Sequence, residues 1–248
     1  MSNSVLFVTG GNSGIGLSTA LKFAESGCNV SILSRRHDEN EAAKKLVEQH
    51  GVKCVTYDGD VASASDVAAA VEQTCERLGG LNYAFNNAGV EQEHLPLPMQ
   101  TEEEYQSVID TNVKGVWLCM QQQIPRMLEA GGGAIVNTGS VASLIGSPLM
   151  PLYAASKHAV LGMSRSVALE YARKNIRVNT VCPAVIETPM FQRYLDVKPE
   201  LKDRMENMHP VGRIGQAEEV ADAVYWLCTG ASWTTGQTVT VDGGFTAQ

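Results

Sequence analysis

One stretch near the start of the chain decides the fold: Val5-Leu6-Phe7-Val8-Thr9-Gly10-Gly11-Asn12-Ser13-Gly14-Ile15-Gly16. Its first four residues are apolar, which predicts a buried strand at 5–8, and an amphipathic helix is predicted at 15–26. The glycines between them allow a tight turn and a close approach to phosphate, while the helix start offers free N–H groups. We therefore predict a strand–turn–helix unit that binds the pyrophosphate of a dinucleotide, although its spacing is G-x-x-x-G-x-G rather than G-x-G-x-x-G.

The same alternation of short apolar runs and longer amphipathic stretches continues along the whole chain. We predict strands at 5–8, 30–33, 53–57, 81–85, 134–138, 177–182 and 237–241. Helices are predicted at 15–26, 38–50, 63–78, 101–129, 151–172 and 217–228, the long one broken near Asn112 and bent at Pro125. The predicted fold class is α/β, a single-domain Rossmann-type doubly wound parallel sheet of about seven strands flanked by helices.

Length and composition exclude several classes of protein. The 248 residues suit one domain, predicted to span 1–248, with 44% hydrophobic and 19% charged residues as in ordinary globular proteins. A net charge of −8 disfavours nucleic-acid binding. The six cysteines and five histidines lack metal-ligand spacing, so no metal site is expected. Without a signal-peptide pattern or a run of about 18 apolar residues, we expect a cytoplasmic protein with no membrane partner.

The end of the second predicted strand bears on the choice of dinucleotide. It reads Ser34-Arg35-Arg36, with no acidic residue before Asp38. An acid here would bind the ribose 2′-hydroxyl of NAD, whereas guanidinium groups attract a 2′-phosphate. The pattern favours NADP(H), and it leaves NAD(H) open because the two arginines could also be solvated loop charges.

Other cofactor contacts are expected where further strands end. Asp60 and Val61 could hold the adenine ring, and the chain at Asn87, Ala88 and Gly89 could pass close to the cofactor. In the glycine loop we expect contacts from Gly10, Asn12, Ser13, Gly14, Ile15 and Gly16.

A proton-transfer pair is predicted on the helix at 151–172. Tyr153 and Lys157 are four residues apart and so share one helix face. A free phenol has a pKa of about 10, and a nearby cation would lower it toward the range that general acid–base catalysis needs. Ser140 ends the strand at 134–138 and could hydrogen-bond a substrate carbonyl. Asn112 is a poor helix former; its amide could hold a proton-relaying water, or it could simply kink the helix.

These motifs, in this order, resemble the short-chain dehydrogenase/reductase family over essentially the whole chain. The resemblance implies a catalytic tetrad of Asn112, Ser140, Tyr153 and Lys157. It also implies cofactor contacts from Tyr153 and Lys157, the latter to the nicotinamide ribose, and contacts near the carboxamide from Pro183, Ile186 and Thr188. Two residues depart from the family pattern: Ala184 stands where many members have glycine, and Ser13 where many NADP(H)-dependent members have a basic residue. The family usually forms tetramers through its two long helices and its last strand, so a homotetramer is expected.

The segment at about 190–215 is the predicted substrate lid, or alternatively a mobile loop with a short helix. It is rich in methionine, which adapts to varied ligands, and Met190 is expected to touch the substrate together with Ser140 and Tyr153. Between Ser140 and Tyr153 an apolar pocket is expected, to which Leu144, Ile145, Leu149 and Met150 would contribute. Such a pocket favours an uncharged ketone, aldehyde or alcohol as the small-molecule substrate.

Three alternative functions remain open from the sequence. The ending Asp242-Gly243-Gly244 resembles that of 3-oxoacyl-[acyl-carrier-protein] reductases, which must dock an acidic carrier. The stretch before the fifth strand, Glu129-Ala130-Gly131-Gly132-Gly133, lacks the basic residues that such docking favours. An NAD-dependent alcohol dehydrogenase is a second alternative. A non-catalytic dinucleotide sensor is the third, and the complete tetrad argues against it.

Overall fold

A seven-stranded parallel sheet forms the centre of the molecule, in a computed structural model that describes residues 4–197 and 199–248. The strand order is β3-β2-β1-β4-β5-β6-β9, and every neighbouring pair is parallel. The order reverses between β1 and β4, which defines the doubly wound topology. The strands are β1 (Val5–Thr9), β2 (Asn29–Ser34), β3 (Cys54–Asp58), β4 (Tyr83–Asn86), β5 (Gly133–Thr138), β6 (Ile176–Pro183) and β9 (Thr238–Val241).

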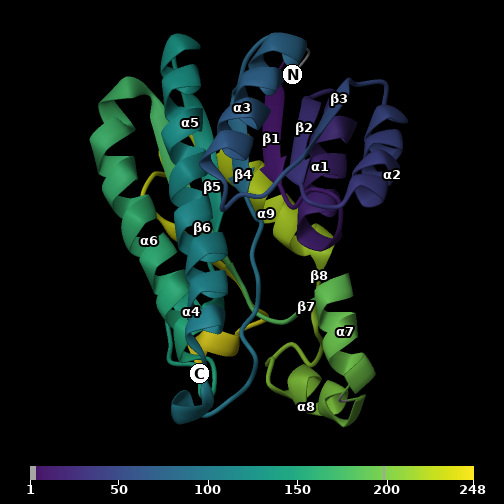
Figure 1. Cartoon of the computed structure of the whole chain (residues 1–248), viewed down its shortest axis with the longest axis vertical. Coiled ribbons are helices and arrows are strands. Elements are labelled where there is room, and N and C mark those ends of the chain that lie inside the picture. Colours follow the sequence, from purple (N-terminus) through teal and green to yellow (C-terminus); the bar gives the residue numbers. More distant parts are fainter. Residues whose placement is uncertain (1–3, 198) are drawn as a thin grey trace.

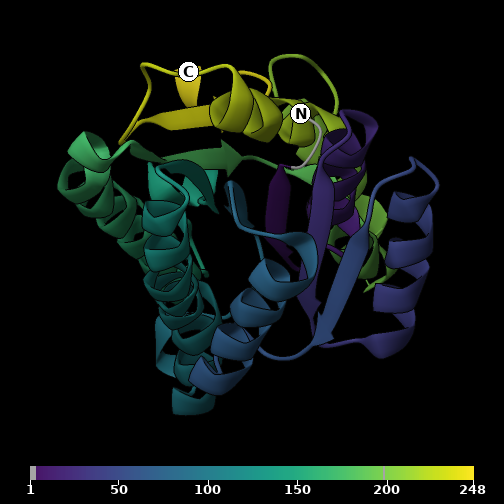
Figure 2. The same ribbon diagram turned by 90° about the horizontal axis from the view of Figure 1, so that it is seen from above.

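Helices cover both faces of the sheet (Figures 1 and 2). One face carries α1 (Gly14–Glu25), α2 (His37–Glu48) and α9 (Ala217–Thr229). The other carries α3 (Ala64–Leu78), α5 (Gly115–Glu129) and α6 (Pro151–Tyr171). Alternate residues of β1 enter different layers, since Leu6 packs with the first group of helices and Phe7 with the second. Burial on both faces is why the strands read as continuous apolar runs.

The predicted break in the long helix is confirmed. Helix α4 (Glu102–Ile109) is followed by one π-helical stretch, Asp110–Lys114, which contains Asn112, and then by α5. Pro125 lies inside α5, as expected. A π-helical turn inserts an extra residue and re-aims the side chains it carries, a feature often found at functional sites.

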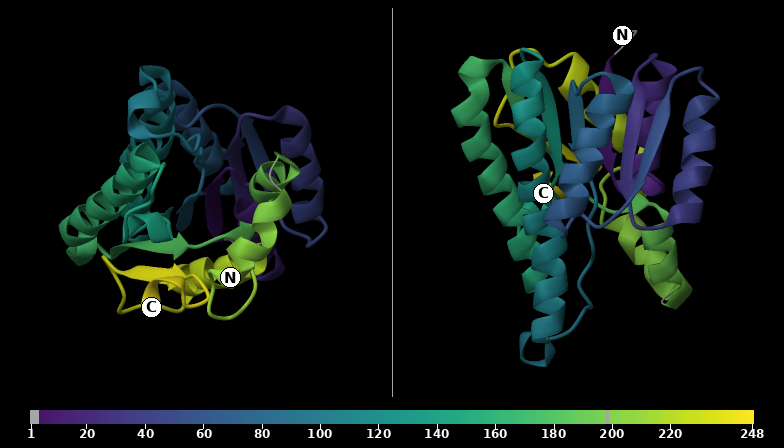
Figure 3. Two further views of the ribbon diagram at one scale, coloured as in Figure 1. Left: turned by 90° about the horizontal axis from the view of Figure 1, so that it is seen from below. Right: turned by 45° about the horizontal axis from the view of Figure 1, so that its top comes forward.

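The predicted lid contains more regular structure than its sequence suggests. Helices α7 (Pro189–Val197) and α8 (Lys202–Asn207) lie between two short parallel strands, β7 (Ile186–Glu187) and β8 (Gly215–Gln216); residue 198 lies outside the described residues. Figure 3 shows that α7 and the start of α4 project from the same end of the molecule, beyond the carboxyl ends of the strands. In the described part of the chain, no helix combines the length and apolar character needed to cross a membrane.

Candidate active site

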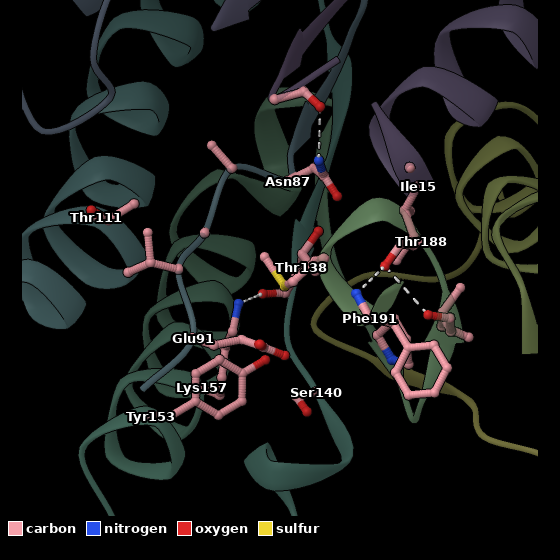
Figure 4. A pocket seen from close by; sticks show the side chains of 18 of the residues that line it. Ile15, Asn87, Glu91, Thr111, Thr138, Ser140, Tyr153, Lys157, Thr188 and Phe191 are labelled. Atoms are coloured by element: carbon pink, nitrogen blue, oxygen red, sulfur yellow. Dashed lines mark hydrogen bonds between the residues drawn. The ribbon is translucent and has the colours of Figure 1, made fainter. Parts of the chain in front are cut away.

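A cleft of about 1160 Å³ opens at the carboxyl ends of β1, β4, β5 and β6 (Figure 4). It lies at the reversal of strand order, where ligands bind in doubly wound sheets. Its walls include the glycine loop on one side, and residues of α7 and α8 on the other. The volume exceeds the roughly 300–1,000 Å³ of most ligand pockets, so it has room for a dinucleotide and a second molecule.

The glycine loop has a backbone shape that only glycine tolerates. Gly10 and Gly14 have φ angles of +62° and +52°, in the left-handed region. A Cβ atom on Gly16 would overlap the carbonyl oxygen of Gly10. The loop is tied to the chain after β4, because the Thr9 hydroxyl oxygen accepts hydrogen bonds from the backbone N–H groups of Asn87 and Ala88, both at 2.9 Å. The predicted turn is therefore a rigid cradle.

Two polar side chains of this cradle leave hydrogen-bonding capacity unused among the described residues. Ser13 is the N-cap residue of α1, but its side chain makes no capping hydrogen bond. The Asn12 amide nitrogen is buried and also lacks a partner among the described residues. Such groups at a helix N-terminus are suited to an anion, since the helix dipole adds a partial positive charge there.

The two arginines after β2 occupy different places at the rim of the cleft. Arg36 donates a hydrogen bond from Nη2 to the Ser13 hydroxyl at 3.3 Å and pairs with Glu39 at 3.0 Å. Arg35 instead faces Asp60, with a distance of 3.7 Å between the charged groups. Asp60 in turn accepts a hydrogen bond from the backbone N–H of Ala62. Both guanidinium groups are largely exposed, so a phosphate could reach them.

Tyr153, Ser140 and Lys157 are brought together in the cleft as predicted. The Ser140 hydroxyl lies near the phenol of Tyr153 and lowers its pKa. The Lys157 Nζ lies 5.6 Å from the centroid of the Tyr153 ring and donates a hydrogen bond to the Thr138 carbonyl oxygen at 2.9 Å. Ser140 is oriented by its own turn, since it caps a short 3-10 helix at Val141–Ser143.

Burial dominates the ionisation of these groups. It raises the pKa of Tyr153 to about 12, an effect that the Ser140 hydroxyl opposes and the charge of Glu91 adds to. Burial also lowers the pKa of Lys157 to about 8. The predicted lowering of the Tyr153 pKa is therefore wrong: its pKa is raised, because burial disfavours the charged phenolate.

The Asn112 side chain forms hydrogen bonds with protein groups rather than facing solvent. Its side chain is buried; Oδ1 accepts a hydrogen bond from the Val90 N–H at 2.8 Å. Its Nδ2 donates to the Val90 carbonyl at 3.0 Å and to the Ser156 hydroxyl at 3.1 Å. Both amide protons of Asn112 are thus engaged. The alternative prediction, that Asn112 kinks the helix, agrees with its place in the π-helical turn. The side chain joins the loop after β4 to the helix that carries Tyr153.

Comparison with known proteins now decides the family. A protein-family model described as "Enoyl-(Acyl carrier protein) reductase" matches residues 10–246 of the chain. The chain belongs to the short-chain dehydrogenase/reductase family. It is therefore an enzyme, a nicotinamide-dependent oxidoreductase acting on CH–OH groups.

Three curated relatives cover nearly all of this enzyme. It is 41% identical to 2,5-dichloro-2,5-cyclohexadiene-1,4-diol dehydrogenase of Sphingobium indicum, over 100% of this chain and 98% of that protein. It is 41% identical to cyclohexanol dehydrogenase of an Acinetobacter species, over 99% and 96% of the two chains. The 3-oxoacyl-[acyl-carrier-protein] reductase of Staphylococcus aureus is 38% identical, over 98% of each.

Solved structures match the fold of this enzyme closely. Levodione reductase superposes with a TM-score of 0.95 at 34% identity, covering 100% of this chain and 99% of the other. ElxO with NADP bound gives 0.93 at 30% identity, covering 100% of both chains. Xylitol dehydrogenase with NAD⁺ bound gives 0.93 at 29% identity, covering 98% and 99%. Neighbours with either dinucleotide therefore share this architecture.

The residues of the enzyme fit a dinucleotide. The positive-φ glycines and the unpartnered Asn12 amide suit its phosphates, and the Asp60–Val61 segment lines the same cleft beyond Arg35. Most of the other predicted contacts also line it, namely Ile15, Ser34, Asn87, Ala88, Gly89, Pro183, Ile186 and Thr188. Gly16 does not line the cleft, and its part is to let α1 pack against Gly10. Asn112 likewise lies behind the wall, which Thr111 forms.

The prediction for the substrate pocket is wrong in part. Met190 and Met150 line the cleft, whereas Leu144, Ile145 and Leu149 do not. The reason lies in the turn after Ser140: the 3-10 helix ends at Ser143, and the chain then turns away so that Leu144 is 38% exposed on the outside. Apolar side chains of the cleft come instead from the lid helices and the C-terminal turn, at Phe191, Met205, Met208 and Phe245.

Two residues of the site carry no recognisable signal in the sequence. The Gln92 side chain is buried, and its Oε1 accepts a hydrogen bond from the Tyr153 backbone N–H at 3.0 Å, which caps the first turn of α6. Glu91 lines the cleft beside it. Both residues follow β4 by only a few positions. Their place after the end of a strand is the one feature of the sequence that indicates a position near the cleft.

Proposed function

We propose that the enzyme interconverts ketones or aldehydes and alcohols with NADP(H), using Tyr153 as general acid and base. The observation that carries this proposal is the meeting of Tyr153, Ser140 and Lys157 in one cleft with the glycine cradle. When bound, the nicotinamide supplies the hydride for carbonyl reduction or accepts it in alcohol oxidation.

The chain's own residues handle the oxygen and the proton. In reduction, the Ser140 hydroxyl and the phenol of Tyr153 donate hydrogen bonds to the carbonyl oxygen, where negative charge develops. Because its pKa is raised to about 12, Tyr153 holds its proton at neutral pH and can pass it to that oxygen. Lys157 adds positive charge nearby and would contact the ribose of a bound dinucleotide, and Asn112 fixes the loop that faces them. In oxidation the same proton moves in the opposite direction.

The preference for NADP(H) rests on the rim next to α1. The residue at the end of β2 is Ser34 rather than an acid, and two guanidinium groups lie nearby. The bond from Arg36 to Ser13 places a cation beside the glycine loop, where many NADP(H)-dependent members of the family have a basic residue at the position of Ser13. Arg36 thus compensates for Ser13, and together with Arg35 it would bind a 2′-phosphate through charge-assisted hydrogen bonds.

Carrier-bound acyl groups are the second candidate substrate. Similarity to a 3-oxoacyl-[acyl-carrier-protein] reductase favours them. The cleft argues for smaller molecules, since it is flanked by Glu91 and Glu93, and an acidic carrier needs a basic docking surface.

A homotetramer is proposed from exposed apolar side chains on the outer helices and near the last strand. Leu169 on α6 is 81% exposed and Trp233, between α9 and β9, is 99% exposed. Tyr105 and Trp117 on α4 and α5 are about half exposed. Exposed apolar groups of this size mark interfaces, and they lie on the elements expected to pair. Sedimentation equilibrium should give about four times the 26.6 kDa chain mass; a single monomeric species would contradict the assembly.

The decisive experiment assays a panel of cyclic and linear ketones and alcohols with NADPH, NADH and their oxidised forms. We expect turnover of uncharged cyclic ketones and alcohols, faster with the NADP couple. Turnover only of carrier-bound 3-oxoacyl thioesters would favour the second candidate. No oxidation or reduction of any compound would overturn the proposal.

A further inference from the structure

Glu91 is a carboxylate in the catalytic cleft that has no hydrogen-bond or ion-pair partner among the described residues. It lines the cleft together with Ser140 and Tyr153, and Figure 4 shows its side chain alongside Tyr153. In the described ranges 4–197 and 199–248, its carboxyl group makes no hydrogen bond and no ion pair. An unpaired acidic group next to the reacting phenol opposes the formation of phenolate, so its presence calls for a separate explanation.

The backbone on both sides of Glu91 is held firmly. Val90 is bonded through both its N–H and its carbonyl to the Asn112 side chain. Gln92 is buried and bonded to the Tyr153 N–H. The segment is therefore fixed to the π turn and to α6, and Glu91 is presented at a set place relative to Tyr153. This contrasts with an ordinary surface glutamate, whose position varies with its loop.

The surroundings of the carboxyl group make a hydrogen-bond donor favourable. Nearby protein atoms displace enough water to raise the pKa of Glu91, and the charge of Arg193 on α7 lowers it in part. A carboxylate that has lost part of its hydration gains more from a new hydrogen bond than one in open water. The group remains open to the cleft, so a ligand can reach it.

The charges of the cleft select the kind of donor. An anionic substrate group would be repelled by Glu91 itself. An ammonium group would approach Lys157, which is buried close to Tyr153, and Arg193 on the facing helix. A neutral hydroxyl group is attracted by the carboxylate and is repelled by neither cation.

We propose that Glu91 binds a second hydroxyl group of the substrate, so that the enzyme favours hydroxyketones and diols over compounds with a single polar group. This inference rests on the proposed carbonyl–alcohol reaction at Tyr153. The hydroxyl donates to the Glu91 carboxylate while the reacting oxygen faces Ser140 and Tyr153. Two anchored oxygens fix the orientation of the substrate, which reduces the loss of freedom at the transition state.

The test compares cyclohexanone with 2-, 3- and 4-hydroxycyclohexanone in the parent enzyme, Glu91→Gln and Glu91→Ala. We expect one isomer to exceed cyclohexanone in kcat/KM by about 10- to 100-fold, the range of a hydrogen bond to a charged group. The preference should shrink in Glu91→Gln, which keeps a neutral acceptor, and disappear in Glu91→Ala. Glu102→Gln removes an exposed charge from the first turn of α4, outside the cleft, and should leave the ratio unchanged.

A second measurement separates binding from structural damage. With cyclohexanol, which lacks the second hydroxyl, Glu91→Gln should shift the pH profile of oxidation to lower pH, because a charge that raises the Tyr153 pKa has been removed. Turnover of all four ketones at equal efficiency by the parent, unchanged in both Glu91 variants, would overturn this inference while leaving the proposed reaction intact. No turnover of any of them would count against the proposed reaction itself.

Discussion

The two halves of the cleft are built in different ways. The dinucleotide half is made by the backbone: Gly10 and Gly14 adopt positive φ angles, and the turn is held by the Thr9 hydroxyl. The substrate half is made by side chains from separate elements, including α6, the loop after β4 and the two lid helices. None of the described residues of α8 is buried, whereas α1 has five buried positions.

This difference explains how one fold can keep its cofactor and vary its substrate. The backbone cradle tolerates few substitutions. A Cβ atom on Gly11 or Gly16 would overlap neighbouring atoms, and Gly10 and Gly14 have positive φ angles. Side chains on a loosely packed lid can be exchanged at small cost in stability. We therefore expect substitutions in the first half to affect folding and cofactor binding, and those in the second half to affect catalysis and specificity.

The largest expected effect separates chemistry from cofactor binding. Tyr153→Phe removes the proton-transfer group without changing the ring, so kcat should fall by about 10²- to 10⁴-fold. Affinity for NADPH, measured by fluorescence titration, should change only a few-fold because the cradle is untouched. An activity equal to that of the parent would disprove the role of Tyr153.

The next effect concerns the rim of the dinucleotide half. Arg35→Ala removes a cation expected to bind the 2′-phosphate, so the ratio of kcat/KM for NADPH over NADH should fall by about 10- to 100-fold. Arg126→Ala, which removes an exposed arginine paired with Glu129 on α5, is the matched control. A parent enzyme that prefers NADH, or an unchanged ratio, would contradict the preference for NADP(H).

The pH dependence should differ between the two directions of the reaction. Reduction needs the protonated phenol, and since the pKa of Tyr153 is raised to about 12, its rate should stay level across neutral pH. Oxidation needs the deprotonated form, whose fraction rises about tenfold per pH unit below the pKa, so its rate should climb with pH. Initial rates between pH 6 and 10 in both directions provide the measurement; a flat oxidation profile would argue against Tyr153 as the base.

A glycine in the cradle tests how rigid that half is. Gly16→Ala places a methyl group on the Gly10 carbonyl and should cost about 1–3 kcal/mol of unfolding free energy, together with NADPH binding. Gly146→Ala is the control, since no atom lies within 4 Å of the added Cβ and its φ is not in the left-handed region. Urea denaturation of both variants would measure the difference in unfolding free energy. Equal stability would mean that the backbone of the cradle can shift to accept the methyl group.

The smallest expected change in stability is in the lid. Met208 lines the cleft and is 40% exposed, so Met208→Ala should cost under about 1 kcal/mol while altering KM for the ketone. Met127→Ala, on the buried face of α5, should cost about 2–5 kcal/mol with KM unchanged. Similar losses of stability in the two variants would show that the lid is packed as tightly as the core.

Local patterns were enough to predict the sheet and most of the cleft. The seven strands and the break near Asn112 follow from apolar runs and from residues that disfavour helix, both of which act over a few neighbours. The glycine loop and the Tyr153–Lys157 spacing are also local, and parallel strands that end at one edge bring such motifs together. The resemblance to the family grouped Asn112 and Ser140 with Tyr153 and Lys157 as one tetrad.

Only the tertiary structure decided how these groups are tuned. The pKa of Tyr153 is raised by burial among separate elements, although a lysine lies one helical turn away. The exclusion of Leu144 depends on the direction of the chain after a short 3-10 turn, and the contact of Arg36 with Ser13 joins two separate loops. Glu91 gains its importance from α6 and the π turn, which hold its neighbours in place. Spacing along the chain specifies which residues share a helix face or a strand end, whereas burial and long-range contact arise only when the layers pack.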